Sequence, residues 1–245
     1  MMLQPVREGW AMAQDRVLKR CKVCRTPIRG FLGFFSRLKG VTVYRKNPQL
    51  CTQCERMDFP PSLRAVSVLF VDIRGYTPLA ERLQPAALTK LLNRYYAATS
   101  EVLFEHDAVI EFAGDAVMAV FNAPISREDH QRAALVSALE IQRAVRELRI
   151  HELAVGVGVN AGQGTVGIMV KGDMRDFTVV GDVVNVAARL QAQARPGEII
   201  ACETVVEKGR DLIPQSYTIE KAALSLKGKE APCQAYILRP WAPAR

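Results

Sequence analysis

Apolar positions divide the middle of the chain into short strands. Apart from Ser67, residues 66–71 form an apolar run rich in β-branched residues, which is typical of a strand buried on both faces. Two further apolar runs, 108–112 and 116–121, flank Gly114-Asp115. A Gly-Asp pair between apolar runs favours a tight turn, because the turn needs a positive φ at its centre. The sequence therefore predicts a buried strand followed by a β-hairpin.

Helical spacing of apolar residues predicts three helices in the remainder of the chain. Apolar residues recur at helical spacing over residues 79–104, with a break expected near Asn93, and again over 127–149 and 182–194. Shorter strands are expected at 153–161, 164–169, 198–201 and 235–238. Helices on one face of a mainly antiparallel sheet would give an α+β fold, ferredoxin-like in its core.

Two aspartates occupy comparable places in this pattern. Asp72 ends the buried strand and precedes a Gly-containing turn into a helix, and Asp115 lies at the hairpin tip. Either residue could simply shape its turn. A pair of carboxylates at such positions also suits Mg²⁺, which prefers oxygen ligands near phosphates. A two-carboxylate Mg²⁺ site is the interpretation that accounts for both.

Three stretches stand out together: VLFVDIRGYT (68–77), EFAGDAVMAVF (111–121) and DFTVVGDVVNVAARL (176–190). They resemble the three signatures of class III adenylate/guanylate cyclase catalytic domains and occur in the family's order. The resemblance covers roughly residues 66–238. It implies the α+β, ferredoxin-like fold and an enzyme that converts a purine nucleoside triphosphate to a 3′,5′-cyclic nucleotide and pyrophosphate.

The resemblance also implies metal ligands and a dimer. Asp72 and Asp115, with the backbone carbonyl of Ile73, would hold two Mg²⁺ (or Mn²⁺) ions that activate the 3′ hydroxyl and neutralise the leaving group. In the family, these residues come from one subunit and the phosphate-facing residues from the other. Since this chain carries both sets, a homodimer is expected.

The second set of residues lies near the C-terminus. Asn185 and Arg189 stand four residues apart, on one helical face. The resemblance assigns Asn185 to the ribose and Arg189 to the phosphate charge that develops in the transition state. It also matches Lys227, in LKGK, to a lysine facing the terminal phosphates.

Two further positions face the purine in the family. Glu111 stands where adenylate cyclases usually carry a lysine; a carboxylate accepts hydrogen bonds and so suits the N1–H and N2–H₂ donors of guanine. The other position, Thr178, serves either base. The expectation is a preference for GTP, with an adenylate cyclase of diverged purine pocket as the alternative.

Charge divides the chain in two. Residues 1–60 hold 12 Lys/Arg and 4 Asp/Glu, while the remainder holds 21 of each. A Pro-Pro sequence then marks a boundary. We expect a basic module at 1–59, a linker at 60–65 and the cyclase domain at 66–240. Within this module, Trp10, Val17 and Leu18 suggest a short helix ahead of the cysteine pairs, which could pack on the module or pair with a partner helix. The absence of an apolar span or signal sequence favours a cytoplasmic protein.

The module carries two Cys-x-x-Cys pairs, Cys21/Cys24 and Cys51/Cys54, separated by 26 residues. This is the ligand set of a structural zinc site, and a segment of this size gains folding energy from a metal. An iron–sulfur or redox role, or unliganded thiols, are the alternatives. Such a module would connect the enzyme to an upstream regulator that the sequence does not identify.

Aromatic and basic residues are interleaved between the cysteine pairs. Residues 30–35 read GFLGFF, and Arg37 and Lys39 follow. We expect these aromatics to fill the core of the module while the charges face solvent. Binding to nucleic acid or to a membrane surface is possible but is not favoured. Two other functions remain open for the whole chain: a non-catalytic cyclase-like dimerisation module, and a nucleic-acid-binding protein suggested by the net charge of +8.

Overall fold

The computed structural model describes residues 21, 24, 26–44, 50–56, 60–150, 153–171 and 174–241. The helix expected around Trp10 lies outside them. The helices are α2 (Gly30–Leu38), α3 (Thr52–Arg56), α4 (Tyr76–Arg82), α5 (Pro85–Glu105), α6 (His130–Glu147), α7 (Asp182–Gln193) and α8 (Glu203–Gly209), with a 3₁₀ turn, η1 (Arg210–Leu212). The strands are β1 (Ser62–Ile73), β2 (Val109–Ala113), β3 (Ala116–Phe121), β4 (Val155–Lys171), β5 (Met174–Val180), β6 (Ile199–Cys202), β7 (Tyr217–Leu224) and β8 (Cys233–Pro240).

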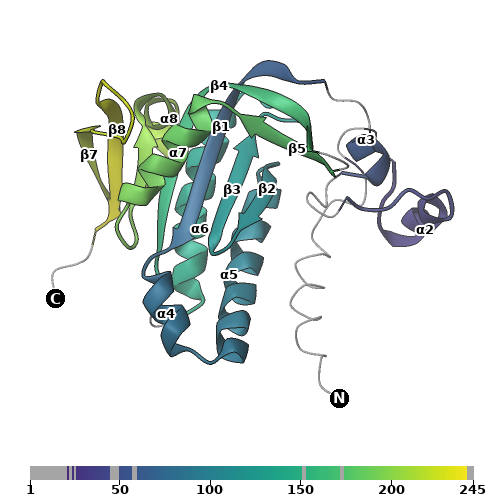
Figure 1. Ribbon diagram of the computed structural model, residues 1–245, viewed down its shortest axis with the longest axis horizontal. Coiled ribbons are helices and arrows are strands. Elements are labelled where there is room, and N and C mark those ends of the chain that lie inside the picture. Colours follow the sequence, from purple (N-terminus) through teal and green to yellow (C-terminus); the bar gives the residue numbers. More distant parts are fainter. Residues whose placement is uncertain are drawn as a thin grey trace.

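One eight-stranded sheet organises the fold (Figure 1). Its order is β2-β3-β1-β4-β6-β8-β7, and β5 pairs with β4 beside this path. β4 and β6 are parallel, whereas the other pairs are antiparallel. The predicted hairpin is β2–β3, and the predicted buried strand is the central β1. The predicted α+β class is confirmed.

The central strand β1 divides its side chains between two cores. Leu69 and Val71 pack with α5 and α6, and Tyr95 of α5 donates a hydrogen bond from its hydroxyl to the Val71 carbonyl at 3.3 Å. Val66 and Val68 face the other side and pack with residues of α7 and β5. Because successive residues of a strand point to opposite faces, a continuous apolar run is needed where both faces are covered.

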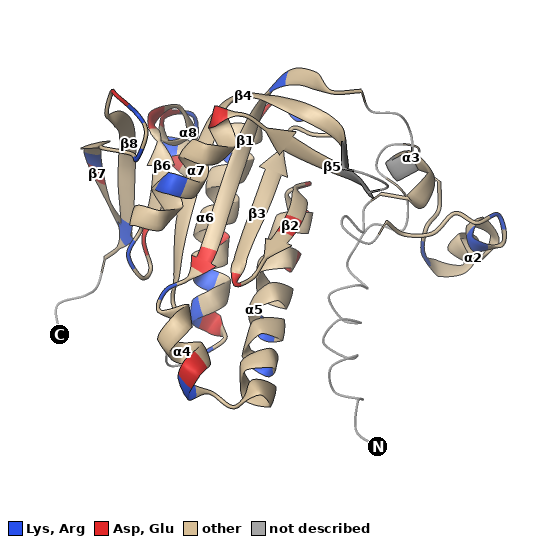
Figure 2. Cartoon of the chain, viewed as in Figure 1, with Lys and Arg blue, Asp and Glu red and all other residues tan. Residues whose placement is uncertain are grey.

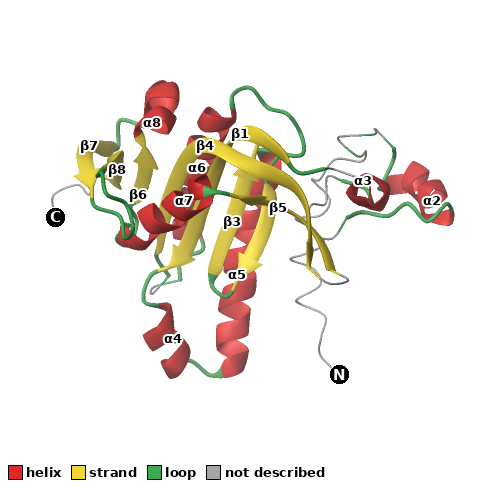
Figure 3. Ribbon diagram, turned by 45° about the horizontal axis from the view of Figure 1, so that its top comes forward, coloured by secondary structure: helices red, strands yellow, loops and turns green. Residues whose placement is uncertain are grey.

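Helices lie on both faces of the sheet, which corrects the expectation of one covered face. α5 and α6 cover one face and α7 crosses the other, as Figures 1 and 3 both show. Glycine in β4 permits this second layer. A Cβ at Gly158 would lie 2.2 Å from the Gln191 amide nitrogen and 2.4 Å from the Ala187 carbonyl oxygen. The alternation of Gly with Val in β4 therefore reflects the close approach of α7.

Several predicted boundaries were wrong. The helical break falls at residues 83–84, where α4 ends and Pro85 begins α5, and α5 continues through Asn93. β4 runs unbroken over the two strands expected at 153–161 and 164–169. β1 begins at Ser62 rather than at residue 66, so that residues 62–65 belong to the strand. The division of the chain into module and cyclase domain stays a prediction.

The N-terminal module has a small core of its own. Cys21, Ile28, Leu50 and the second cysteine pair are buried together, and Ile125, from the segment between β3 and α6, packs against them. The expectation that the aromatics of GFLGFF fill this core was wrong, because Phe31, Phe34 and Phe35 are 50–78% exposed. α2 instead presents its small residues to the module, and its large apolar ones face away from it.

Candidate functional site

Asp72 lies at the carboxyl end of β1, on the face covered by α7. Its Oδ2 accepts hydrogen bonds from Arg74 Nη2 at 3.1 Å and from Gln191 Nε2 at 3.4 Å. Its Oδ1 is shielded from solvent and has no hydrogen-bond partner among the described residues. A buried carboxylate oxygen without a partner is costly unless something else satisfies it. Asp72 thus presents one tethered oxygen and one that is available to a ligand.

Asp115 approaches Asp72 from the β2–β3 turn. The preceding Gly114 has φ +63°, as the Gly-Asp pattern predicts, and its carbonyl accepts a hydrogen bond from the Tyr96 hydroxyl. Burial and the adjacent Asp72 carboxyl raise the pKa of Asp115 to about 6. Two carboxylates that oppose one another in this way are stabilised by a cation placed between them. Their donor set and the unpartnered Asp72 Oδ1 fit a divalent cation.

The two residues that hydrogen-bond to Asp72 were not predicted. Gln191 lies on the buried face of α7 and is 8% exposed, and Arg74 follows β1 directly. Arg74 also donates from Nη1 to the Ala194 carbonyl at 3.4 Å. Both residues therefore attach the end of β1 to the end of α7. A buried polar residue within the apolar stripe of a helix is the sequence signal that could have indicated Gln191.

Ile73, the other predicted metal ligand, completes the end of β1. Its side chain is buried, 3% exposed, and it pairs with Val155 of β4. The following residue, Arg74, donates its amide to the Ala154 carbonyl at 2.8 Å. The backbone around the Ile73 carbonyl is therefore held on the sheet, next to Asp72.

Glu111 lies on β2, the edge strand, opposite Met118 of β3. Met118 is in turn opposite Phe70 of β1, so Glu111 shares a sheet face with Phe70 and with Asp72 two residues further on. The Oε1 of Glu111 is shielded from solvent and has no hydrogen-bond partner among the described residues. It is available to a donor from a ligand.

Thr178 is remote from Glu111 within one chain. It lies on β5 opposite Gly167 of β4, and β3, β1 and β4 separate β5 from β2. Four inter-strand steps of about 4.8 Å separate the two positions across the sheet. The register adds a separation along the strands, because Glu111 is in line with Gly158 of β4 and Thr178 with Gly167. The two expected purine contacts do not meet inside a single subunit.

Asn185 and Arg189 lie on the outer face of α7, as their spacing predicts. Asn185 is exposed and Arg189 is partly exposed, whereas Val183, Ala187 and Leu190 of the same helix face the sheet. Arg189 Nη2 lies 3.6 Å from the point where a Cβ on Gly228 would stand, next to the exposed Lys227. Arg189 and the Lys227 turn thus form a second group, on the opposite side of α7 from the Gln191–Asp72 contact.

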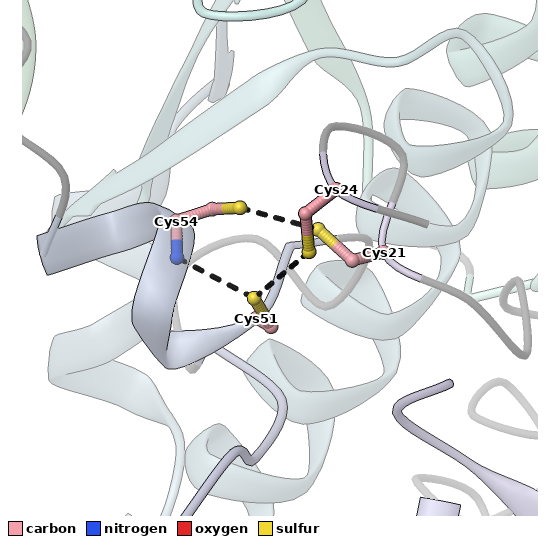
Figure 4. A group of neighbouring side chains, drawn as sticks. All are labelled: Cys21, Cys24, Cys51 and Cys54. Atoms are coloured by element: carbon pink, nitrogen blue, oxygen red, sulfur yellow. Dashed lines mark hydrogen bonds between the residues drawn. The ribbon is translucent and has the colours of Figure 1, made fainter. Parts of the chain in front are cut away.

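The four cysteines of the module converge (Figure 4). Their sulfurs all lie within 4.8 Å of one another, with Cys21 and Cys54 3.8 Å apart and Cys24 and Cys51 3.5 Å apart. Four thiolates at about 2.3 Å from one Zn²⁺ stand about 3.8 Å from one another. The Cys54 amide donates to Cys51 Sγ at 3.4 Å. The cluster therefore has the ligands and the spacing of a tetrahedral metal site.

The thiols differ in their protonation. Burial raises the pKa of Cys51 and of Cys54. Burial also acts to raise the pKa of Cys24, but hydrogen bonds with Thr26 and with the neighbouring thiols outweigh it and lower that pKa to about 6. A bound metal would hold all four sulfurs as thiolates.

Comparisons with known proteins agree with this architecture. The sequence profile of the adenylate and guanylate cyclase catalytic domain matches residues 60–240. The solved structure of the guanylyl cyclase Cya2 is 28% identical, with a TM-score of 0.66, over 74% of this chain and 94% of that one. The adenylyl cyclase CyaB from P. aeruginosa is also 28% identical, with a TM-score of 0.68, over 76% and 97%. The chain belongs to the adenylate and guanylate cyclase catalytic domain family.

The curated relatives are longer proteins. An uncharacterized protein of Mycobacterium tuberculosis is 35% identical over 173 residues, which are 69% of this chain and 32% of the relative. The chain thus spans about a third of the length of this relative. Within the described residues, no helix is both long and apolar enough to cross a lipid bilayer.

Proposed function

We propose that this chain is a class III nucleotide cyclase that converts a purine nucleoside triphosphate, preferentially GTP, to its 3′,5′-cyclic product and pyrophosphate. The observation that carries the proposal is the meeting of Asp72 and Asp115 beside an unpartnered, shielded carboxylate oxygen. Asp72, Asp115 and the Ile73 carbonyl would hold Mg²⁺ or Mn²⁺. When bound, such ions activate the 3′ hydroxyl and neutralise charge on the departing pyrophosphate.

The chain's own residues position the substrate. Arg74 and Gln191 orient the Asp72 carboxylate, as outer-sphere hydrogen bonds do in metal sites. Asn185 would hold the ribose, while Arg189 would stabilise charge on the reacting phosphate. Lys227, next to Arg189, would meet the terminal phosphates.

The active site is proposed to form between two copies of the chain. The exposed position of Asn185, on the side of α7 away from Asp72, and the wide separation of Glu111 from Thr178 support this arrangement. A homodimer related by a two-fold axis would bring each Asp pair opposite the Asn185/Arg189 face of the other copy, giving two sites.

Competition between substrates tests the proposal. Purified protein is given GTP and ATP together with Mg²⁺ or Mn²⁺, and both cyclic products and pyrophosphate are quantified. We expect cyclic GMP to dominate and Asp115→Asn to abolish both products. Asp211→Asn is the matched control, since Asp211 is 65% exposed and pairs with Arg132 far from the site. No product with either metal would indicate a non-catalytic module, and cyclic AMP in excess would overturn only the preference for GTP.

For the module, we propose a structural zinc ion held by Cys21, Cys24, Cys51 and Cys54. The spacing of the four sulfurs supports it. Elemental analysis of purified protein should give about one zinc per chain. Cys51→Ser should lose the metal, and Cys233→Ser, which alters a half-buried thiol of β8, should retain it. Iron with visible absorption would favour an iron–sulfur centre, and no metal at all would refute both.

A further inference from the structure

The helix α2 is arranged contrary to the usual amphipathic pattern. Its buried residues are the small ones, Gly33 and Ser36. A Cβ at Gly33 would lie 2.7 Å from the carbonyl carbon of Ile28, so the first turn of α2 lies directly against the buried residue that precedes the helix. In a helix that only completes a core, large apolar side chains face inward.

The large apolar residues of α2 instead form one continuous exposed surface. This surface, named here the α2 patch, consists of five side chains that are 50–78% exposed: Phe31, Leu32, Phe34, Phe35 and Leu38. The ring of Phe35 contacts those of Phe31 and Phe34 edge-to-face, with centroids 5.5 and 5.9 Å apart. Contiguous apolar surface of this kind marks an interaction site rather than ordinary exposure.

Positive charge lies beside the α2 patch and along the sequence on both sides of it. Arg37 and Lys39 are exposed beside it, and residues 16–54 contain ten Lys/Arg and no Asp/Glu. Figure 2 shows a basic position on α2 and no acidic one. The rest of the chain, from residue 61 on, is neutral. A partner of the α2 patch must therefore accept both apolar side chains and cations.

We propose that the α2 patch inserts into the interfacial layer of a bilayer that contains anionic lipids. Phenyl and leucyl groups would enter the acyl boundary, while Arg37 and Lys39 would lie at the headgroups. A second copy of the patch is a poorer occupant, because it would bring two strongly basic segments together. Nine residues of helix extend only about 14 Å, so α2 lies along the surface and does not span the bilayer.

The position of α2 suits a flat partner. Figures 1 and 3 both place it at the end of the molecule remote from β7 and β8, where it projects beyond the catalytic sheet. Each phenyl group that leaves water strengthens partitioning by roughly tenfold or more. Each cation near an anionic surface adds roughly fivefold. Three phenyl groups and two cations are sufficient for reversible attachment.

Vesicle sedimentation of the full, metal-loaded chain tests the inference. Vesicles of phosphatidylcholine alone are compared with mixtures containing increasing phosphatidylserine. We expect binding that rises with phosphatidylserine and falls with NaCl. The Phe34→Ser/Phe35→Ser variant should bind roughly a hundredfold more weakly, since two phenyl groups are lost. Trp241→Ser, which removes a 62% exposed aromatic outside the module, is the matched control and should bind like the wild type.

The charge requirement has its own pair of variants. Arg37→Gln/Lys39→Gln should weaken binding roughly thirtyfold, whereas Arg143→Gln/Arg146→Gln on α6 should not. Cyclase activity without vesicles should be unchanged in all four variants, which separates this inference from the proposed activity. Equal binding to pure phosphatidylcholine would overturn the role of anionic lipid. Absence of vesicle binding would overturn the inference as a whole. In that case, loss of self-association or of salt-dependent RNA binding in the same variants would assign the α2 patch to a second copy of the chain or to RNA.

Discussion

Glu111 is the residue on which the proposed choice of purine depends. Its shielded Oε1 lacks a partner among the described residues, so a guanine N–H would satisfy it. An adenine would instead oppose its N1 lone pair to the carboxylate. A mismatch between buried polar groups of this kind is worth roughly 10²-fold or more in specificity.

We therefore expect Glu111→Lys to shift the ratio of cyclic GMP to cyclic AMP toward ATP by about 10²-fold, because an ammonium donates where the carboxylate accepts. Both products are measured with GTP and ATP present together. Glu147→Lys, on an exposed turn of α6, controls for the change in net charge. An unchanged ratio would mean that Glu111 does not contact the base.

His130 gives the stability of the catalytic domain a dependence on pH. It begins α6, is 5% exposed and shares a 2.8 Å hydrogen bond between its Nδ1 and the hydroxyl of Ser67 on β1. Burial lowers the pKa of His130 below its ordinary value of 6.5, although Asp129 acts in the opposite direction. The unfolded chain therefore binds a proton more readily than the folded one as the pH falls through this range.

Between pH 7 and pH 5, protonation of His130 acts to lower the Tm, whereas protonation of Asp115, whose pKa is raised to about 6, acts to raise it. His130→Asn, which can still hydrogen-bond Ser67, isolates the first contribution: compared with this variant, the wild type should lose Tm as the pH falls. Thermal unfolding followed by circular dichroism in buffers of constant ionic strength measures both. Parallel curves for the two proteins would assign the pH dependence to other groups.

Part of the candidate site could be predicted from individual residues. Asp72 and Asp115 were each indicated by a local pattern, a strand end and a Gly-Asp turn, and the structure brings them together. Gln191 could not be found in the same way. It contacts Asp72 across 119 positions of sequence, and only the packing of α7 on β4 creates that contact.

At the scale of elements, the approach of α7 to β4 depends on Gly158. A methyl group there would meet backbone atoms of α7 that cannot rotate away. We expect Gly158→Ala to lower the free energy of unfolding by about 3 kcal/mol or more. Because it displaces Gln191 from Asp72, it should also weaken activation by Mg²⁺.

Gly162→Ala is the control within the same strand. A Cβ at Gly162 would lie 3.5 Å from Val183 Cγ2, which is an ordinary contact. Urea unfolding of both variants should show a loss at position 158 and a change within about 0.5 kcal/mol at 162. Equal losses would mean that glycine is required in β4 for its backbone rather than for the approach of the helix.

Element boundaries were predictable only where local chemistry decides them. Pro85 begins α5 for a reason visible in the sequence, because proline suits the first turn of a helix, whereas Asn93 does not interrupt the helix. The sequence pattern did not show that β4 is continuous, because its second half is stabilised by antiparallel pairing with β5. The exposure of the apolar side chains of α2 was also not predictable, since composition alone does not say which side of a helix packs against the module.

For the whole molecule, the distribution of site residues predicts complementation between subunits. In the proposed site, Asp115→Asn would remove a metal ligand, and Arg189→Ala would remove a phosphate contact supplied by the other copy of the chain. A mixed dimer would contain one site with every wild-type group. Random exchange then restores about a quarter of wild-type activity to a mixture of two inactive proteins.

The measurement is cyclase activity after mixing, with subunit exchange verified by mass-tagged chains. Asp115→Asn mixed with Asp72→Asn is the control, because both changes affect the same half of the site and no intact site can form. Exchange without recovered activity would place all catalytic groups within one chain.

The strand β1 ties the two ends of this molecule together mechanically. It leaves the module at Ser62, reaches Asp72 at its far end, and its 12 residues span roughly 40 Å. Ladders with β3 and β4 hold it along both edges, so it cannot slide along its axis without breaking both. A displacement of the module would therefore move β1 and Asp72 as one body with the neighbouring strands, instead of distorting the site within the chain. In the proposed homodimer, such a movement would change how the two copies meet at the site.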